Sequence, residues 1–313
     1  MSNSRWSIVL AGGQGERMAA AIEQWLGERR PKQFCAFSQG LTMLEHTFLR
    51  ARGVVAAEQI VTVIGRDHRR YVEELGSEIP GVVLEQPHRA GTAAGLLLPL
   101  SWVMARDPDA VVCVLPSDHF VNPPGQFRKL LDYAMTLAAR TPEALFLFGA
   151  QPTHPECDYG WIASAPREDR WESLARPVVS FHEKPTEQFA LQYFDAGYLW
   201  NTFIIAAKAS AIWRAATSTV PEVIGRLDPV VSELSRLDVT PTDVHHAVND
   251  AYRTMPELDF SRDVIEKFDG PVGVIPLYDV EWNDWGRPER IVESLAKTGE
   301  ILALEMTGHA RAG

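Results

Sequence analysis

Cysteine is scarce in this sequence, and long apolar runs and clusters of basic residues are absent. The three cysteines, Cys35, Cys113 and Cys157, lie far apart and do not have the spacing of a metal site. We therefore expect no disulfide framework, and we expect the protein to be cytoplasmic. No stretch approaches the roughly 18 apolar residues of a membrane-spanning helix, and the start of the chain does not resemble a secretory signal. The formal net charge of −11 disfavours nucleic acid as a partner.

Alternating strand and helix patterns run through the 313 residues, which are enough for one large α/β domain. They favour a Rossmann-like, mostly parallel sheet with helices on both faces. The predicted strands of the first half are residues 7–11, 59–65, 82–85, 110–115 and 145–149, and its clearest helices are 41–52 and 126–140. Thr42 and Glu45 have the spacing of a capping box at the start of the first of these helices.

The second half has a less regular pattern with longer polar connections. Strands are predicted at 159–163, 178–182, 202–206 and 273–278, and helices over most of 208–268 and at 289–297. The segment S-R-D-V-I-E-K-F is the clearest helical piece of this half. We see no internal repeat or linker, so one continuous domain is expected.

A glycine-rich turn follows the first predicted strand in S-I-V-L-A-G-G-Q-G-E-R-M, residues 7–18. Gly12, Gly13 and Gly15 allow a sharp bend and expose backbone N–H groups, which suits a polyphosphate. Arg17 and Lys32 would add a compact cationic seat for a triphosphate. The turn matches neither a Walker A loop nor a dinucleotide fingerprint, and a tight structural connection is the alternative.

Two aspartates are candidates for holding Mg²⁺. Asp118 follows the apolar strand of V-V-C-V-L-P-S-D-H-F, and Asp284 stands in Y-D-V-E-W-N-D-W-G after another predicted strand. Mg²⁺ favours one or two carboxylates together with phosphate oxygens and waters. Asp279 and Glu281 compete with Asp284 for this role, and a turn-forming role is the alternative for Asp118.

Two further segments suit a sugar phosphate. F-H-E-K-P-T places Glu183 and Lys184 at a predicted strand end, where an acceptor for hydroxyl groups stands beside a cation for a phosphate. Y-L-W-N-T-F-I carries Asn201, whose amide both donates and accepts hydrogen bonds. An exposed turn and a buried tryptophan beside a turn are the structural alternatives.

Taken together and in order, these pieces resemble the sugar nucleotidyltransferases, specifically the mannose-1-phosphate guanylyltransferases. The resemblance covers residues 10 to about 290 and rests on L-A-G-G-Q-G-E-R-M, P-K-Q-F, E-Q-P-H-R-A-G-T-A-A, L-P-S-D-H, Y-G-W-I, F-H-E-K-P, Y-L-W-N-T, D-F-S-R-D-V-I-E-K and W-N-D-W-G. It implies a single nucleotidyltransferase domain of GT-A-like fold over 1–313. Residues 1–150 would bind the nucleotide, 151–290 the sugar phosphate, and 291–313 would form a C-terminal helix and tail, without a β-helix or isomerase domain.

The resemblance also implies a role for each matched residue. The nucleotide would be bound by Leu10, Ala11, Gly12, Gly13, Gly15, Arg17, Glu85, Gly91 and Thr92, and the sugar phosphate by Gly160, Glu183, Lys184 and Asn201. Asp118 and Asp284 would hold Mg²⁺, the expected cofactor. Arg17, Lys32 and Asp118 would be the catalytic residues, because the cations stabilise the leaving pyrophosphate and the metal aligns the phosphates.

The implied reaction joins a hexose 1-phosphate, expected to be mannose 1-phosphate, to an NTP, expected to be GTP. The sugar phosphate attacks the α-phosphorus in line, which gives the NDP-sugar and pyrophosphate. The family usually has Thr or Ser in place of Glu16, R-L-W-P-L-S-R in place of the connection after Met18, R-N-T-A-P-A in place of R-A-G-T-A-A-G, and W-S-D-V-G in place of W-N-D-W-G.

Three other functions compete with this one. One is the same chemistry with another NTP, such as dTTP or ATP, or with another sugar 1-phosphate. Another is a catalytically weak relative that binds a nucleotide sugar and regulates a partner. A glycosyltransferase is disfavoured, because S-D-H lacks the acid-x-acid metal motif. The sequence does not fix the oligomeric state, and a homodimer is one expectation.

Overall fold

A nine-stranded sheet forms the centre of the computed structural model, which describes residues 4–38, 40–76, 79–165 and 174–299. The strand order is β3-β2-β1-β4-β9-β6-β10-β8-β7. The strands are β1 (Arg5–Ala11), β2 (Ile60–Gly65), β3 (Val82–Gln86), β4 (Val111–Pro116), β6 (Leu145–Ala150), β7 (Gly160–Ser164), β8 (Arg176–Glu183), β9 (Leu199–Lys208) and β10 (Val272–Pro276). A separate ribbon pairs β5 (Phe120–Asn122) with β11 (Glu281–Asn283) in antiparallel register.

The sheet is parallel in its first half and mixed in its second. Strands β3, β2, β1 and β4 are parallel neighbours, as expected for strands joined by helical crossovers. β9 runs antiparallel to both β4 and β6, and β8 runs antiparallel to β7 and β10. The α/β fold class is therefore confirmed, and the less regular second half corresponds to the antiparallel strands.

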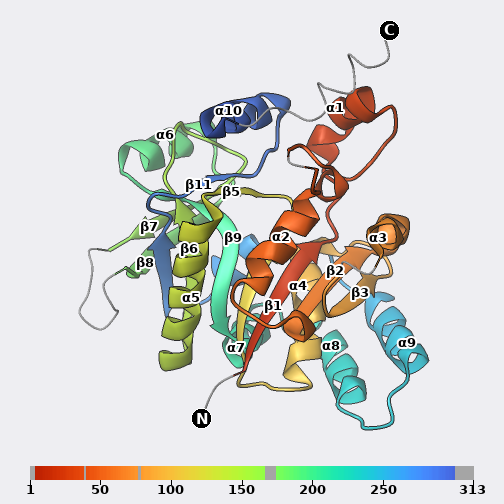
Figure 1. The fold of residues 1–313 in the computed structure, drawn as a ribbon. Helices are drawn as coiled ribbons and strands as arrows, with labels where there is room; N and C mark the ends of the chain where they lie inside the picture. The colour runs from red at the N-terminus through yellow and green to blue at the C-terminus, as the bar shows by residue number, and fades with distance from the viewer. Residues whose placement is uncertain (1–3, 39, 77–78, 166–173, 300–313) are drawn as a thin grey trace, which may run out of the picture.

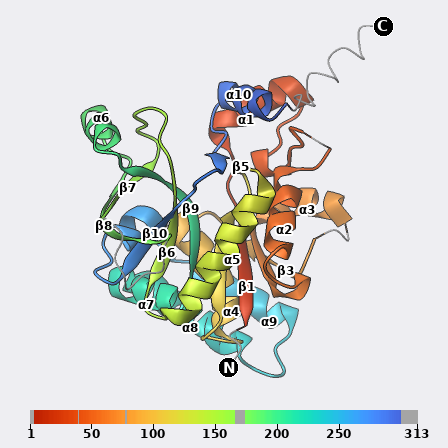
Figure 2. The same ribbon diagram turned by 60° about the vertical axis from the view of Figure 1, so that its left-hand side comes forward.

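Helices cover both faces of the sheet (Figures 1 and 2). They are α1 (Glu16–Leu26), α2 (Met43–Arg52), α3 (Arg69–Leu75), α4 (Gly91–Met104), α5 (Pro124–Arg140), α6 (Glu187–Asp195), α7 (Ala209–Thr219), α8 (Pro221–Leu234), α9 (Pro241–Tyr252) and α10 (Pro288–Thr298). Strand β4 shows why two faces are needed: Val112 and Val114 pack in the core with α4, α7 and α8, while Cys113 and Leu115 pack in the core with α2 and α5. Successive strand side chains point to opposite faces. Among the described residues, no helix has the length and apolar character to cross a membrane.

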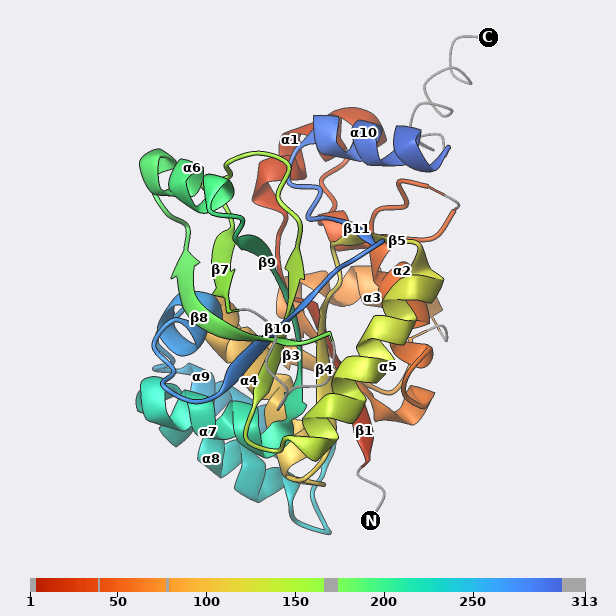
Figure 3. The ribbon, with the colours of Figure 1, turned by 90° about the vertical axis from the view of Figure 1, so that its left-hand side faces the viewer.

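Helix α1 from the start of the chain and α10 from its end lie side by side (Figure 3). Their apolar stripes join one small core, in which Met18 and Ile22 of α1 pack with Ile291 and Leu295 of α10. Trp285 belongs to the same core. This packing fixes the segment before α10, and therefore Asp284, close to the glycine-rich turn before α1.

Most predicted elements agree with the structure to within a few residues. The capping box of Thr42 and Glu45 is present at the start of α2. Two predictions need correction. The segment S-R-D-V-I-E-K-F is a π-helical stretch at Phe260–Ile265 rather than an ordinary α-helix. The predicted strand 273–278 ends at Pro276, and Asp284 follows the short separate strand β11.

Candidate active site

The glycine-rich turn joins β1 to α1 and packs closely against two side chains. A Cβ on Gly15, whose φ is +62°, would lie 3.0 Å from the Cβ of Lys32, and one on Gly12 would lie 2.5 Å from Nε2 of Gln86. A Cβ on Gly13 would meet nothing within 4 Å. The glycines at 12 and 15 therefore allow close approach and a left-handed backbone, while Gly13 faces open space.

A first cavity, here called the glycine-loop pocket, has a volume of about 380 Å³. It lies at the carboxyl ends of the parallel strands, where open α/β sheets bind ligands. The residues from the predicted nucleotide and metal sites that line it are Leu10, Gly12, Gly13, Gly91, Thr92 and Asp118. Helix α4 begins at Gly91, and three residues of its first turns, Gly91, Thr92 and Gly95, line this pocket.

Not every predicted nucleotide residue lines the glycine-loop pocket, and Glu85 is the clearest correction. Its carboxylate forms a bidentate ion pair with Arg69 of α3, with both N–O distances 2.8 Å. The next residue, Gln86, lines the pocket instead, because neighbouring strand side chains point to opposite faces. Ala11 is buried, and its carbonyl accepts a hydrogen bond from Nε2 of Gln33 at 2.9 Å. Gly15 contacts Lys32 outside the pocket lining.

A second cavity, here called the Glu183 pocket, has a volume of about 430 Å³ and adjoins the first. The four predicted sugar-phosphate residues, Gly160, Glu183, Lys184 and Asn201, all line it, together with Arg17 and Asp284. Thr92, His119 and Phe203 line both cavities and form their shared boundary. The structure thus brings the two predicted halves of the site together.

Glu183 ends β8 and carries an unused acceptor. Its Oε2 atom is buried and has no hydrogen-bond partner in the described part of the chain, and burial raises the pKa of this carboxyl. Lys184 lies beside it, with Nζ 3.3 Å from Oε1 of Glu183, and adopts a positive φ of 47°. A buried acceptor without a partner is costly for the free protein and is available to a hydroxyl group of a ligand.

Lys32 lies between the two candidate metal ligands. It is only 3% exposed, and its Nζ is 3.0 Å from Oδ2 of Asp118 and also donates to the backbone carbonyl of Asp284. Burial raises the pKa of the Asp118 carboxyl, but Lys32 and His119 outweigh this effect and hold it below its usual value. Both cations of the predicted compact seat are paired with acids in the structure: Lys32 with Asp118, and Arg17 with Asp158 and Asp284.

The carboxylate of Asp284 is surrounded by donors. Its Oδ1 accepts from the Tyr159 hydroxyl, from Nη1 of Arg290 at 2.9 Å and from the Gly286 N–H at 3.0 Å, while Oδ2 accepts from Arg17 at 2.7 Å. Burial raises the pKa of Asp284, but the nearby cations and the tyrosine outweigh it and keep the pKa far below its usual range. The carboxylate is thus ionised and held in one orientation.

Asp118 and Asp284 have the donor chemistry for a divalent cation. A carboxylate oxygen carries two lone pairs, and among the described residues Oδ2 of Asp284 accepts a hydrogen bond from Arg17 alone. Asp118 is 36% exposed at its side chain. No cluster of three or more His, Cys, Asp or Glu side chains suited to a metal occurs among the described residues, so phosphate oxygens and waters would complete the coordination, as Mg²⁺ prefers.

Sequence reasoning missed three side chains that shape the site. Gln86 and Tyr159 lie within two motifs of the family resemblance, E-Q-P and Y-G-W-I. The alternation of side chains along a strand could have identified Gln86. Arg290 bridges Asp284 to Glu156, with Nη2 bonded to Glu156. No local pattern marks Arg290, because its partners lie in other segments of the chain.

The structure is an α/β fold with two adjoining pockets, the first of which lies at the carboxyl ends of the parallel strands. Residues 6–300 match the nucleotidyl transferase family, and the chain belongs to that family.

Three relatives illustrate the similarity. The chain is 29% identical to the mannose-1-phosphate guanylyltransferase of Escherichia coli K12, over 94% of this chain and 60% of that protein. It is 30% identical to the alginate biosynthesis protein AlgA of Pseudomonas syringae pv. tomato, over 89% of this chain and 56% of that one. A crystal structure from Thermus thermophilus, described as a mannose-1-phosphate geranyltransferase, superposes with a TM-score of 0.77 at 26% identity, over 92% of this chain and 79% of that one. The chain thus spans less than two thirds of the length of these two sequence relatives.

Proposed function

We propose that this protein is a sugar-1-phosphate nucleotidyltransferase, which joins a hexose 1-phosphate to an NTP and releases pyrophosphate. The observation that carries the proposal is the pair of adjoining cavities, with Asp118 lining one, Asp284 lining the other and Lys32 contacting both acids. An NTP in the glycine-loop pocket and a sugar phosphate in the Glu183 pocket would meet at this boundary. The names of the relatives favour GTP and mannose 1-phosphate.

The chemistry requires alignment and charge neutralisation rather than a covalent protein intermediate. The sugar phosphate is already an ionised nucleophile, so the obstacle is repulsion between two anions. Arg17 is half-exposed and paired with Asp284 and Asp158, so its guanidinium can be offered to the triphosphate when the nucleotide binds. Lys184 would steer the incoming sugar phosphate, and the buried Oε2 of Glu183 would accept a sugar hydroxyl.

We further propose Mg²⁺ as the cofactor, held by Asp118 and Asp284. When bound, the ion would neutralise phosphate charge and orient the phosphate oxygens. Lys32 would keep both acids ionised and close together.

A pyrophosphate-release screen of five NTPs against several sugar 1-phosphates tests the proposal and identifies the substrates. Asp118→Asn should lower kcat by roughly 10²–10³, the usual loss for one electrostatic contact in a transition state. Asp109→Asn is the matched control, because Asp109 is exposed and pairs with Lys208 away from the site. Near-normal turnover by Asp118→Asn would refute the role of this acid.

The crowding of Asp284 by Arg17, Arg290 and Tyr159 favours one second candidate, a relative that binds a nucleotide sugar without turning it over. Tight binding of a GDP-sugar with no metal-dependent pyrophosphate release in the same screen would select this candidate. Turnover that depends on Mg²⁺ would exclude it.

A further inference from the structure

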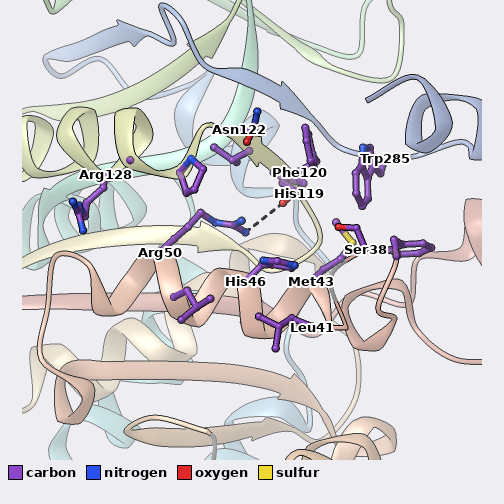
Figure 4. A pocket seen from close by; sticks show the side chains of 15 residues that line it. Ser38, Leu41, Met43, His46, Arg50, His119, Phe120, Asn122, Arg128 and Trp285 are labelled. Carbon is purple, nitrogen blue, oxygen red and sulfur yellow. Dashed lines mark hydrogen bonds between the residues drawn. The ribbon is translucent and has the colours of Figure 1, made fainter. Parts of the chain in front are cut away.

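A third cavity, here called the Arg50 pocket, is lined by residues of α2, β5 and the start of α5, together with Trp285 (Figure 4). Its volume is about 380 Å³, equal to that of the glycine-loop pocket. Its wall is largely apolar and includes Leu41, Met43, Phe120 and Trp285, while its cations are Arg50 and Arg128. Neither the family resemblance nor the reaction proposed above uses this cavity.

Arg50 is the most unusual side chain in the Arg50 pocket. Its Nη2 donates to the hydroxyl of Thr47 and, at 3.3 Å, to the backbone carbonyl of His119, as the dashed line in Figure 4 shows for His119. No carboxylate pairs with it among the described residues. Burial lowers the pKa of this guanidinium to about 10, with no acid to offset the loss of water. A desolvated cation without a counter-charge is unfavourable.

Among the described residues that line the Arg50 pocket, the side chains of fixed charge are two arginines. Of the 15 residues that line it, two are arginines and none is an aspartate or glutamate, in a chain whose net charge is −11. Arg128 is exposed and lines the same cavity. A guanidinium presents a planar fork of N–H donors that matches phosphate and carboxylate oxygens.

The apolar wall indicates that a ligand here carries more than a bare anion. Phe120 stacks on Trp285 with the ring centres 4.8 Å apart and the planes at 15°. The indole N–H of Trp285 is buried and has no acceptor in the part of the chain that the structure describes. A cavity of this kind, apolar with a few placed polar groups, is typical of small-molecule sites.

The Arg50 pocket contacts both acid-bearing loops. Arg50 holds the carbonyl of His119, the residue after Asp118, and Trp285 is the residue after Asp284. β5 and β11 join these two loops through the pairing of Phe120 with Asn283. A ligand in the Arg50 pocket would therefore touch the neighbour of each acid.

We propose that the Arg50 pocket is a separate binding site for a small organic phosphate with an apolar or aromatic group, and that its occupancy changes the activity of the site beside it. The binding claim stands on the charge and shape of the cavity alone. The claim of altered activity rests on the proposed nucleotidyl transfer.

Isothermal titration of the full chain with phenyl phosphate tests the binding claim. Arg50→Met should weaken binding about tenfold or more, because charge-assisted hydrogen bonds are lost, and Arg128→Met should weaken it less. Arg214 of α7 is exposed and pairs with Glu143, so Arg214→Met should bind phenyl phosphate as the wild type does. Uncharged phenol should bind at least tenfold more weakly than phenyl phosphate. If Arg50→Met does not fold, Arg50→Lys replaces it in the experiment. Arg50→Lys should bind phenyl phosphate more weakly than the wild type, because lysine lacks the planar fork of N–H donors, and this result would support the site.

Two results would overturn the Arg50 site. One is wild-type affinity of Arg50→Met or Arg50→Lys for phenyl phosphate. The other is complete competition of phenyl phosphate with GTP or mannose 1-phosphate, which would place it in one of the other two pockets. Failure of the proposed function would give a different result. The protein would bind phenyl phosphate through Arg50 but release no pyrophosphate with any substrate. The binding claim would then stand, and the claim of altered activity would be refuted. Turnover unchanged by saturating phenyl phosphate would refute the regulatory claim alone.

Discussion

Arg290 offers the sharpest test of what holds the site together. It lies in α10, and its guanidinium bonds the carboxylates of Asp284 and Glu156, with 2.9 Å between Nη1 and Oδ1 of Asp284. The side chains of all three residues are nearly buried, at 11%, 8% and 7% exposed. Arg290→Met would remove the cation and leave two buried carboxylates with less positive charge to balance them.

The magnitude follows from this burial. Removing one partner of a buried ion pair typically destabilises a protein by about 3–5 kcal/mol. Asp284 keeps Arg17 and Lys32, and Glu156 keeps the N–H of Asp158 at 3.0 Å, so we expect the lower end, about 3 kcal/mol. Urea unfolding at pH 7 should show a lower midpoint at an unchanged slope.

The pH dependence of this effect has a definite sign. The pKa values of Asp284 and Glu156 are held below their usual values in the folded protein. Their contribution to stability is therefore present above the unfolded pKa values of about 4 and is lost as the pH falls through the folded ones. The gap between wild type and Arg290→Met should be full at pH 7 and shrink below about pH 4.

The matched control for Arg290 is Arg253→Met, which breaks an exposed ion pair with Asp250 and should change stability by at most about 1 kcal/mol. Equal urea midpoints for Arg290→Met and wild type at pH 7 would refute the reasoning. So would a gap that widens as the pH falls below about 4.

Three further predictions concern other parts of the chain. Glu183→Gln should raise the melting temperature at pH 7.5 by the equivalent of about 1 kcal/mol, because it removes a buried charge with an unpaired oxygen, while weakening mannose 1-phosphate binding in titrations. The raised pKa of Glu183 means that this gain should fade as the pH drops and the wild-type carboxyl protonates; a gain that grows toward low pH would contradict it. Gly91→Ala should be far more destabilising in thermal unfolding than Gly197→Ala, since both have a positive φ but only a Cβ at position 91 meets backbone atoms, at 2.1 Å; equal losses would contradict the clash. A thiol reagent at pH 8 should label Cys157 in the native protein and all three cysteines in denaturant, because burial raises the pKa of the other two thiols to about 12 and 11; native labelling of three thiols would show that the core is open.

Local pattern was sufficient for most of the elements around the site. Alternating apolar strands and helices predicted the α/β class, and the Thr42 capping box was readable because all of its contacts lie within one helical turn. The same is true of the glycine-rich turn, whose left-handed residue Gly15 is set by local backbone geometry. The motifs also placed Asp118, Glu183 and Lys184 at strand ends, which is where the structure has them.

Contacts between distant segments were beyond local pattern. Asp284 depends on a separate short strand that pairs with β5, and on α10 packing against α1. Glu85 was predicted at the nucleotide site, but Gln86 lines the cavity, because the neighbours of a strand decide which of its faces meets a cavity. A one-residue shift reverses every side chain of a strand.

By itself the sequence determined the α/β fold, the family and the residue types that could carry phosphate chemistry, because these follow from short-range periodicity and ordered motifs. Only the tertiary structure decided that Lys32 lies between two acids and that Arg290 holds the Asp284 carboxylate in place. It also decided that Arg50 lines a cavity in which no carboxylate of the described residues pairs with it. Each of these depends on side chains brought together from segments far apart in the chain, and their charges gain strength only once packing has removed the water between them.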